Sequence, residues 1–267
     1  MKGMFGFGQL INILKKNPKK IVFTEGKDPR ILEAASRLLA SYFLHPILVG
    51  SEEEIQEAAE ESGFNIRGAE IINPASYNKM EEMIAELVEM RKNKGMTREK
   101  AEKLLLQANY FGTMLVHMGE ADALLGGATY STADTVRPAL QLIKTKPGNK
   151  IVSSCFILVR PAATGENEVM AMGDCAINIH PSEDELVEIA LETAKCAKLF
   201  GVEPQVAFLS YSTYGSGTGE DVDKMRNAAQ KTKERDPELP VAGELQFDAA
   251  VSPRVARTKC PDAPVAG

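Results

Sequence analysis

The sequence predicts an α/β protein of two lobes, in which mainly parallel strands alternate with helices. Short runs rich in β-branched residues alternate with amphipathic helical patterns along the whole chain, which is typical of βαβ units on a parallel sheet. With 267 residues, 44% of them hydrophobic, the chain is long enough for two packed lobes. Turn-forming residues concentrate at 146–149 (KPGN), which predicts a first lobe of residues 1–147 and a second lobe of residues 148–267.

The first half of the chain opens with the clearest βαβ unit. Residues 20–24 (KIVFT) are predicted to form a buried strand, followed by a turn and by a helix that begins near Pro29. After a second strand at 46–49, Ser51 and Glu54 have the spacing of a capping box, which predicts a helix that ends near Gly63. The remaining elements expected in this half are helices at 80–92, 97–107 and 111–118, a strand at 121–125 and a helix at 131–143.

The second half is predicted to contain strands at 150–158, 169–172, 175–179, 205–209 and 241–245. The run at 150–158 is apolar enough for a central strand of a parallel sheet. Ser182 and Glu185 form a second capping-box pattern before a long amphipathic helix, and another helix is expected at 221–235. The alternation then stops at Gly267, where a further strand and helix would be expected.

Composition argues against several classes of partner. The net charge of -6 disfavours nucleic acid, whose phosphates are normally met by a broadly basic face. No apolar run approaches the roughly 18 residues that span a bilayer, and the N-terminal stretch lacks a cleavage-site pattern. We therefore expect a cytoplasmic protein that binds neither nucleic acid nor a membrane.

Motifs for metal binding and for a protein nucleophile are absent from the sequence. The four cysteines form no C-x-x-C pair and the three histidines have no metal-ligand spacing, so we expect reduced thiols and no metal. There is no Walker A loop, H-E-x-x-H or G-x-S-x-G motif. Cys175, beside Asp174, is the only cysteine that is a candidate for a position near a site, and a weak one.

Turns that follow strands are the candidate sites, because ligands of open parallel sheets bind beyond the carboxyl ends of the strands. Residues 25–30 combine a glycine with two basic side chains at a helix start, which suits an anion. A plain turn capped by Asp28 explains the same residues and is the preferred interpretation.

The turn at 126–134 is the second candidate. Its small and hydroxyl residues, including Ser131 and Thr132, lie at a helix start, where backbone N–H groups and side chains can bind a phosphate. Arg137 follows one to two turns later in the same helix and could bind the same anion. Ser131 and Asp134 also have the spacing of a helix cap, and both interpretations can hold together.

Two further segments are weaker candidates. The hydroxyl-rich turn at 210–219 could line a pocket for a phosphorylated or pantetheine-bearing ligand, or could be an ordinary mobile surface loop. The basic run at 91–95 (RKNKG) ends a helix, where cations interact favourably with the helix dipole.

Six segments, in order along the chain, resemble the phosphate acetyl/butyryltransferase family. They are KIVFTEGKDPRILEAA, EMRKNKGMT, ADALLGGATYSTADTVRPALQ, GDCAINIHPSEDELVEIA, LSYSTYGSG and PVAGELQFDAAVSP. Together they span nearly the whole chain. The third segment, followed by the SEDELVEIA helix, is closer to the acetyl than to the butyryl members.

The resemblance implies two α/β/α lobes similar to isocitrate and isopropylmalate dehydrogenases, usually in a homodimer, with the site in the cleft between the lobes. It implies exchange of an acetyl group between coenzyme A (CoA) and inorganic phosphate, with CoA, acetyl-CoA, acetyl phosphate and phosphate as small-molecule substrates. No metal and no acyl-enzyme are expected. An aspartate deprotonates the CoA thiol, and a serine and arginines stabilise the oxyanion and the departing phosphate.

Matching motifs carry some of the family's functional residues onto this chain. The residues implied at the phosphate or CoA site are Arg137, Ser131, Thr132 and Arg91, and those implied to line the cleft are Tyr130, Ser210, Ser212, Tyr214 and Ser216. The family's catalytic aspartate and its Ser-Arg pair have no counterpart before Gly267, so we expect this chain to be inactive or impaired.

Three alternatives stay open: a phosphate butyryltransferase, a non-catalytic CoA- or phosphate-binding paralogue, and a cofactor-dependent dehydrogenase of the related fold. The dehydrogenase is disfavoured because the sequence has neither a clustered set of aspartates for a divalent metal nor a nucleotide fingerprint.

Overall fold

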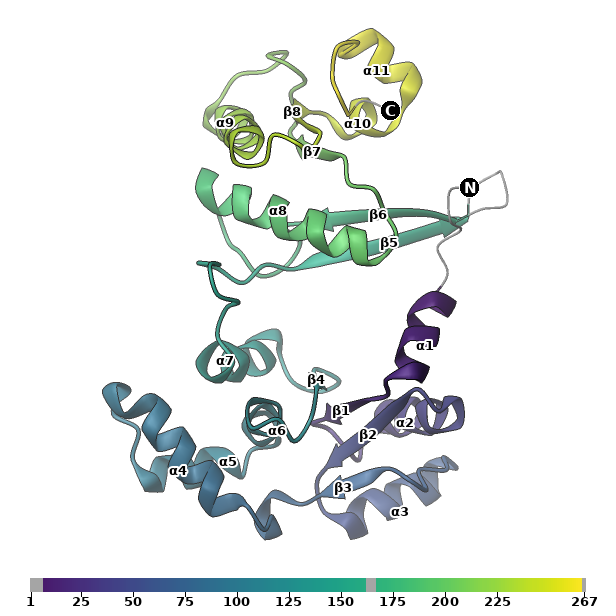
Figure 1. Cartoon of the computed structure of the whole chain (residues 1–267), viewed down its shortest axis with the longest axis vertical. Coiled ribbons are helices and arrows are strands. Elements are labelled where there is room, and N and C mark those ends of the chain that lie inside the picture. The colour runs from purple at the N-terminus through teal and green to yellow at the C-terminus, as the bar shows by residue number, and fades with distance from the viewer. Residues whose placement is uncertain (1–6, 162–166, 266–267) are drawn as a thin grey trace. The chain divides into compact units, whose positions relative to one another are not determined.

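The computed structural model describes residues 7–161 and 167–265, which form an α/β protein (Figure 1). The chain divides into two compact units between Lys144 and Thr145. Eleven α-helices and eight strands lie within the described residues, and none of these helices is long and apolar enough to cross a membrane. The predicted α/β class with a mainly parallel sheet is confirmed, whereas the expected likeness to dehydrogenase lobes stays a prediction.

The unit that ends at Lys144 is built on a four-stranded parallel sheet of order β3-β2-β1-β4. The strands are β1 (Lys19–Phe23), β2 (Leu44–Val49), β3 (Glu70–Ile72) and β4 (Ala123–Leu125). Val22 of β1 lies opposite Ile47 of β2 and Leu124 of β4, so branched and long apolar side chains meet across the central strands. Sequence analysis missed β3, whose three residues are too short for a periodic signal.

Alternation along the strands buries the two faces of this sheet under different helices. Val22 and Ile47 pack with the helices α4, α5 and α6, whereas Phe23 and Leu48 pack with α2 and α3 on the opposite face (Figure 1). The helices of this unit are α1 (Phe7–Lys16), α2 (Pro29–Ser41), α3 (Glu52–Ser62), α4 (Met80–Arg91), α5 (Arg98–Leu105), α6 (Ala108–His117) and α7 (Thr132–Leu142).

Most helix-boundary signals in the first unit are confirmed. Asp28 is the N-cap of α2 and accepts the N–H of Arg30 at 2.9 Å, and Gly63 ends α3 in the left-handed conformation. The capping box predicted for α3 is wrong: Ser51 is the N-cap but makes no side-chain cap bond, and Glu54 pairs with Lys27 instead.

The unit that begins at Thr145 opens with an antiparallel pair, β5 (Cys155–Pro161) and β6 (Asn167–Gly173). The prediction of a central parallel strand at 150–158 is therefore wrong. The N–H groups of Lys150 and Ile151 bind the buried carboxylate of Glu188, at 2.8 and 3.1 Å, rather than a neighbouring strand. Phe156 of β5 is 54% exposed, so the apolar run reflects a half-covered ribbon and not a sheet centre.

The strand predicted at 175–179 is also absent from the described structure, where this segment is a bend that leads to α8. Asp174 and His180, on either side of it, both have positive φ, which breaks an extended run. Ile179 is 86% exposed, so its apolar side chain does not mark a buried strand.

The strands β7 (Val206–Leu209) and β8 (Val241–Leu245) pair in parallel between two helical layers (Figure 1). Val241 packs toward α8 (Glu183–Leu199) and α9 (Glu220–Arg235), whereas Ala242 packs toward α10 (Phe247–Val251) and α11 (Pro253–Lys259). The capping box of Ser182 and Glu185 at the start of α8 is confirmed. Sequence analysis did not predict α10 and α11, which are too short for a clear helical period.

Gly112 allows α6 to approach the sheet of the first unit. A Cβ atom at this position would lie 3.0 Å from side-chain carbons of Val22, Thr24 and Leu124. These distances are shorter than ordinary carbon contacts, so a larger residue would push the helix away from β1 and β4. The close approach also places α6 beside Thr24, at the edge where the candidate site lies.

Replacing Gly112 tests this packing. We expect Gly112→Leu to lower the free energy of unfolding by about 2 kcal/mol through overpacking. Gly112→Ala should stay close to the wild type, because its gain in helix propensity of roughly 1 kcal/mol opposes milder crowding. Urea denaturation followed by circular dichroism measures both, and a Leu variant as stable as the Ala variant would contradict the close approach.

Candidate functional site

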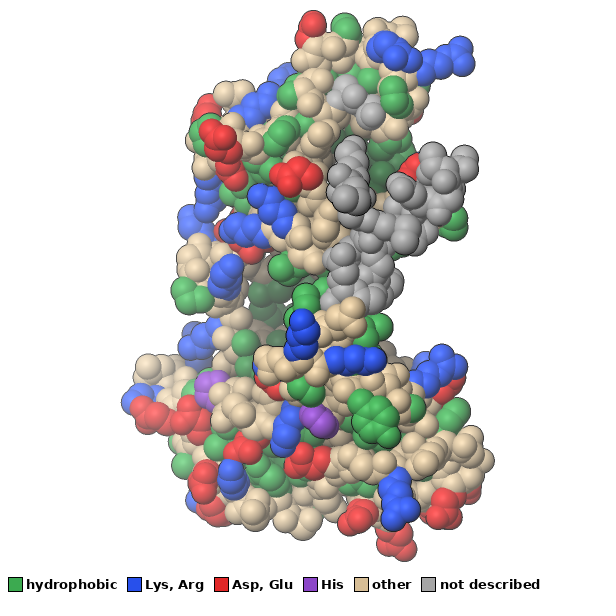
Figure 2. All heavy atoms as spheres, turned by 45° about the vertical axis from the view of Figure 1, so that its right-hand side comes forward, with side chains coloured by type: hydrophobic (Ala, Val, Ile, Leu, Met, Phe, Trp, Pro, Cys, Tyr) green, Lys and Arg blue, Asp and Glu red, His purple; other side chains and the backbone are tan. Residues whose placement is uncertain are grey.

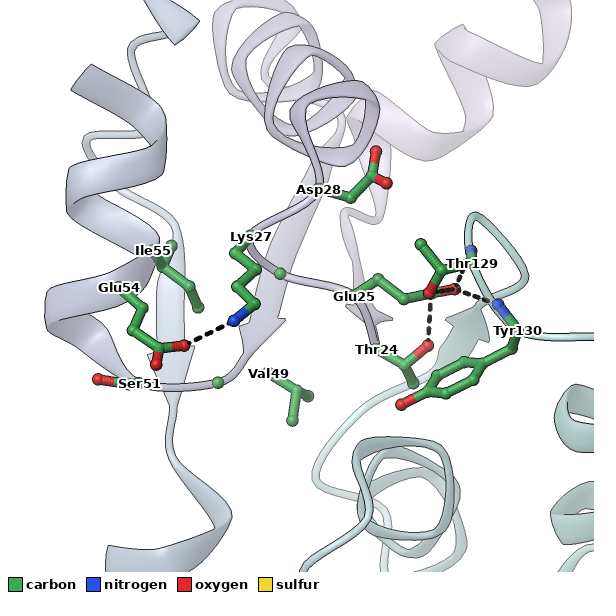
Figure 3. A pocket seen from close by; sticks show the side chains of 12 residues that line it. Thr24, Glu25, Lys27, Asp28, Val49, Ser51, Glu54, Ile55, Thr129 and Tyr130 are labelled. Carbon is green, nitrogen blue, oxygen red and sulfur yellow. Dashed lines mark hydrogen bonds and ion pairs between the residues drawn. The ribbon is translucent and has the colours of Figure 1, made fainter. Parts of the chain in front are cut away.

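A cavity of about 310 Å³ opens at the carboxyl edge of the four-stranded parallel sheet (Figure 3). Its walls come from the segments that follow β1 and β2 and from the turn between β4 and α7. The lining residues are Thr24, Glu25, Gly26, Lys27, Asp28, Val49, Gly50, Ser51, Glu54, Ile55, Thr129 and Tyr130. This is the edge at which ligands of open parallel sheets bind.

The carboxylate of Glu25 organises the turn between β4 and α7, which comprises residues 126–131 and is called the β4–α7 turn below. Its Oε1 accepts the backbone N–H groups of Gly127, Thr129 and Tyr130 at 3.1, 2.9 and 3.3 Å. Its Oε2 accepts the hydroxyl of Thr24 at 2.8 Å. Figure 3 shows the side chain pointing at this turn rather than into open space. Glu25 is only 9% exposed, so these bonds replace water around the charge.

The same bonds keep Glu25 ionised. Burial raises the pKa of this carboxyl, but the hydrogen bonds from Thr129, Thr24, Tyr130 and Gly127 together lower it by more. The net pKa lies below the ordinary value of 4.5. At neutral pH the β4–α7 turn is therefore wrapped around a negative charge that belongs to the protein itself.

This arrangement corrects part of the expectation for the 126–134 turn. Three of its backbone N–H groups already bind Glu25, so they are not offered to a phosphate. What remains for an anion is the start of α7, where the N–H groups of Thr132 and Ala133 have no acceptor within the helix. Ser131 and Thr132 are exposed there.

Arg30 clamps the β4–α7 turn from a second direction. Its Nη2 donates to the carbonyl oxygen of Ala128 and to Oδ2 of Asp28, both at 2.7 Å. The 25–30 turn, interpreted from sequence as a plain capped turn, does have Asp28 as its cap. Through Glu25 and Arg30, the 25–30 turn also binds the β4–α7 turn. The sequence did not reveal this contact, because the backbone partners of Glu25 in that turn lie 102 to 105 residues away.

Ser131 and Arg137, two of the predicted anion-binding residues, meet at the carboxylate of Asp134. Ser131 is the N-cap of α7: its hydroxyl accepts the N–H of Asp134 at 3.1 Å and donates to Oδ2 at 2.6 Å. Arg137 pairs loosely with Oδ1 of Asp134, with 3.5 Å between the atoms, and its side chain is 56% exposed. An anion in solvent can thus reach the guanidinium of Arg137, which would have to give up its contact with Asp134 to bind it.

Arg91 approaches the other end of the same helix. It is the last residue of α4, and its Nη1 donates to the carbonyl oxygen of Gln141 at 3.5 Å. Gln141 lies four residues after Arg137, on the same face of α7. Arg91 Nε is buried and has no hydrogen-bond partner within the described residues, an unusual situation for a guanidinium. Of the predicted residues, Ser131, Thr132, Arg137 and Arg91 therefore all lie on or against α7.

The second unit holds its hydroxyl-rich turn, residues 210–219, in a similar way. This segment, called the β7–α9 turn below, wraps around Glu244 at the end of β8, which is fully buried. Oε1 of Glu244 accepts the N–H of Gly215 at 2.7 Å and the hydroxyl of Ser212 at 3.2 Å. Arg226 of α9 pairs with both carboxylate oxygens, at 2.9 and 3.1 Å.

The predicted lining residues of the β7–α9 turn differ in exposure. Ser212 is buried, and its hydroxyl is used inside the turn, where it also accepts the N–H of Gly217 at 2.9 Å. Ser210 accepts the N–H of Ser212 at 3.2 Å, and Ser216 accepts that of Thr213 at 2.9 Å. Tyr214 is 46% exposed. The role of these residues toward a ligand stays a prediction, as does that of Tyr130.

Within residues 7–161 and 167–265, no group of three or more His, Cys, Asp and Glu residues is arranged to hold a metal. Burial and the contact with Cys196 raise the pKa of Cys155 to about 11, so this group is a thiol at neutral pH. Cys175 Sγ lies 3.5 Å from Ser154 Oγ.

Charged side chains of both signs are interspersed over the face drawn in Figure 2. With a net charge of -6, the overall field of the chain repels anions. An anionic ligand would therefore need local donors to bind against this field.

Replacing Glu244 tests the carboxylate that holds the β7–α9 turn. We expect Glu244→Gln to lower the free energy of unfolding by about 2 kcal/mol at pH 7, because it removes charge-assisted hydrogen bonds from a buried site. Burial raises the pKa of Glu244, but Arg226 and the N–H of Gly215 lower it by more, to below the ordinary value of 4.5.

The pH dependence follows from that direction. The ionised group stabilises the fold above pH 4.5, and this contribution is lost as the pH falls through the lower pKa of the folded state. The difference between wild type and variant should thus shrink below about pH 4. Urea denaturation at several pH values measures it, with the exposed Glu203→Gln as control; equal stability of all three proteins at pH 7 would count against the role of Glu244.

Comparison with known proteins gives close matches over nearly the whole chain. The sequence model of one family, described as phosphate acetyl/butaryl transferase, matches residues 7–267. A phosphate acetyltransferase of Bacillus subtilis (strain 168) is 50% identical over 248 residues, which are 93% of this chain and 75% of that protein. The crystal structure of a phosphotransacetylase from Streptococcus pyogenes superposes with a TM-score of 0.90 at 47% identity, covering 98% of this chain and 78% of the other.

Proposed function

Because the chain belongs to the phosphate acetyl/butyryl transferase family, we propose that it catalyses the exchange of an acetyl group between CoA and inorganic phosphate. The observation that carries this proposal is the 50% identity to a phosphate acetyltransferase over 93% of the chain. A relative in Thermoanaerobacterium thermosaccharolyticum, with 46% identity over 260 residues, bears the same name. These names favour acetyl over butyryl as the transferred group.

The start of α7 is our proposed anion site. Ser131 and Thr132 are exposed at the positive end of the helix dipole, and Arg137 lies on the following turn with a loosely held partner. Phosphate oxygens bind well to such a combination of backbone donors and a guanidinium. Bound there, the phosphate group of acetyl phosphate or of CoA would displace Arg137 from Asp134.

Arg91 is our proposed second cation for CoA. Its buried, unpartnered Nε, described above, leaves one donor of the guanidinium unused. Its Nη1 contact with Gln141 holds the side chain against α7. Two arginines against one helix suit a ligand that carries several phosphate groups, as CoA does.

The proposed reaction joins the CoA sulfur to the acetyl carbon. The thiolate attacks the carbonyl of acetyl phosphate, the bond from that carbon to the phosphate oxygen breaks, and phosphate leaves with the electron pair. Donors at α7 stabilise the charge that collects on the phosphate. The thiol proton passes to a base. The family resemblance implies that this base is an aspartate, and we assign no residue of this chain to that role.

The remaining expectations belong to the same proposal. We propose a homodimer in the cytoplasm that uses neither a metal nor a nucleic acid and whose lobes resemble those of isocitrate and isopropylmalate dehydrogenases. We keep Tyr130, Ser210, Tyr214 and Ser216 as proposed ligand-lining residues. Ser212 is the weakest of the set, because its hydroxyl is consumed within the β7–α9 turn.

The function is tested by thioester formation from CoA with acetyl phosphate or butyryl phosphate. Both the 267-residue chain and the product of the complete reading frame that encodes it should be assayed, together with CoA binding by calorimetry. We expect the reading-frame product to use acetyl phosphate faster than butyryl phosphate. If the reading-frame product reacted faster with butyryl phosphate, a butyryltransferase would be favoured. If it bound CoA without turnover, a non-catalytic paralogue would be favoured.

Arg137→Ala tests the proposed anion site. We expect a loss of roughly tenfold to hundredfold in kcat/KM, corresponding to one or two charge-assisted hydrogen bonds. Arg37→Ala is the control. Arg37 lies on the surface of α2, and its side chain pairs with Glu33 of the same helix. Unchanged kinetics of Arg137→Ala would remove this residue from the site.

A further inference from the structure

Glu25 has no role in the reaction proposed above, although it is buried, charged and next to the proposed anion site. Its hydrogen bonds are satisfied within the protein, by Thr24 on one oxygen and by the β4–α7 turn on the other. A carboxylate that already accepts these four hydrogen bonds has little capacity left for a substrate, and its charge would repel phosphate. Glu25 is therefore poorly suited to contact the ligand itself.

The contacts of Glu25 end one residue before the N-cap of α7. Three N–H groups within four residues converge on one oxygen atom, which restricts the orientation of each of those peptide planes. The last of them belongs to Tyr130, and the next residue is Ser131, the N-cap of α7. No flexible residue separates the carboxylate's contacts from the cap.

Two other features of the β4–α7 turn, Gly127 and the contact with Arg30, constrain its shape less than Glu25 does. Gly127 has a φ of 107°, a conformation that glycine tolerates, so the turn does not hold its shape through side-chain sterics there. The second clamp, from Arg30 to Ala128, comes from a side chain that is 67% exposed and therefore competes with water. The buried, charge-assisted contact is the stronger constraint.

We propose that Glu25 is a positioning residue for substrate binding: as an internal anion it holds the β4–α7 turn so that Ser131, Thr132 and Arg137 are preorganised for the phosphate of the substrate. This inference rests on the proposed function of those three residues. From the sequence, the 25–30 turn suits the binding of an anion. Under this proposal it instead supplies one, the carboxylate of Glu25.

Two substitutions separate the shape of Glu25 from its charge. Glu25→Gln keeps one oxygen that can accept the N–H groups but removes the charge, and Glu25→Ala removes both. Glu33→Gln is the control: Glu33 is a carboxylate of α2 that pairs with Arg37 of the same helix, and it is not among the residues that line the cavity.

Substrate binding is the decisive readout. We expect Glu25→Ala to raise KM for acetyl phosphate and Kd for CoA by about tenfold, the effect of roughly one lost charge-assisted contact. Glu25→Gln should show a smaller increase, and Glu33→Gln should match the wild type. Amide hydrogen exchange should become faster at Gly127, Thr129 and Tyr130 in Glu25→Ala, while β1 and β2 stay protected.

The outcomes distinguish this inference from the proposed function. If the wild-type product of the complete reading frame neither turns over nor binds CoA, the proposed function fails and this inference falls with it. If the wild type is active and Glu25→Ala is folded with unchanged KM and Kd, only the positioning role is overturned. The positioning role is also overturned if Glu25→Ala does not fold and Glu25→Gln binds like the wild type, or if Glu33→Gln loses as much affinity as Glu25→Gln.

Discussion

Buried glutamate carboxylates hold three loop segments of this protein by accepting their backbone N–H groups. Within the described residues, the charged side chains that are buried are Glu25, Glu188 and Glu244. Each accepts at least one main-chain N–H group, from the β4–α7 turn, from Lys150 and Ile151, and from the β7–α9 turn respectively. Burying a charge is costly unless hydrogen bonds replace its water, so each carboxylate fixes the turn that supplies those bonds.

This constraint explains how an acidic chain can present donors to an anion. The glycine-rich β4–α7 turn resembles a phosphate-binding loop in composition, but its N–H groups are occupied by Glu25. Free backbone N–H groups remain at the start of α7, where the exposed Arg137 adds a positive charge. Under our proposal, Glu25 supplies the support and the start of α7 supplies the exposed donors, so that the donors are in place before the ligand arrives.

Much of the first unit could be predicted from the sequence, because its signals are local. The strand after Lys19, the α2 cap at Asp28 and the α7 cap at Ser131 follow from periodicity and from side chains that bond within three residues. The strand predicted at 150–158 failed for the opposite reason. An apolar run indicates burial, but it carries no information on whether its neighbour is parallel, antiparallel or, as at Lys150, a glutamate side chain.

The sequence by itself determined the α/β class, the family resemblance, and the hydroxyls and Arg137 at the start of one helix. The tertiary structure alone decided that Glu25 supports that helix start and that Glu244 holds the second turn. The physical reason is that these carboxylates bind main-chain N–H groups, which every residue except proline carries, so the partners leave no mark on the sequence. In the case of Glu25 they also lie 102 to 105 residues away, and only the pairing of β1 with β4 brings them together.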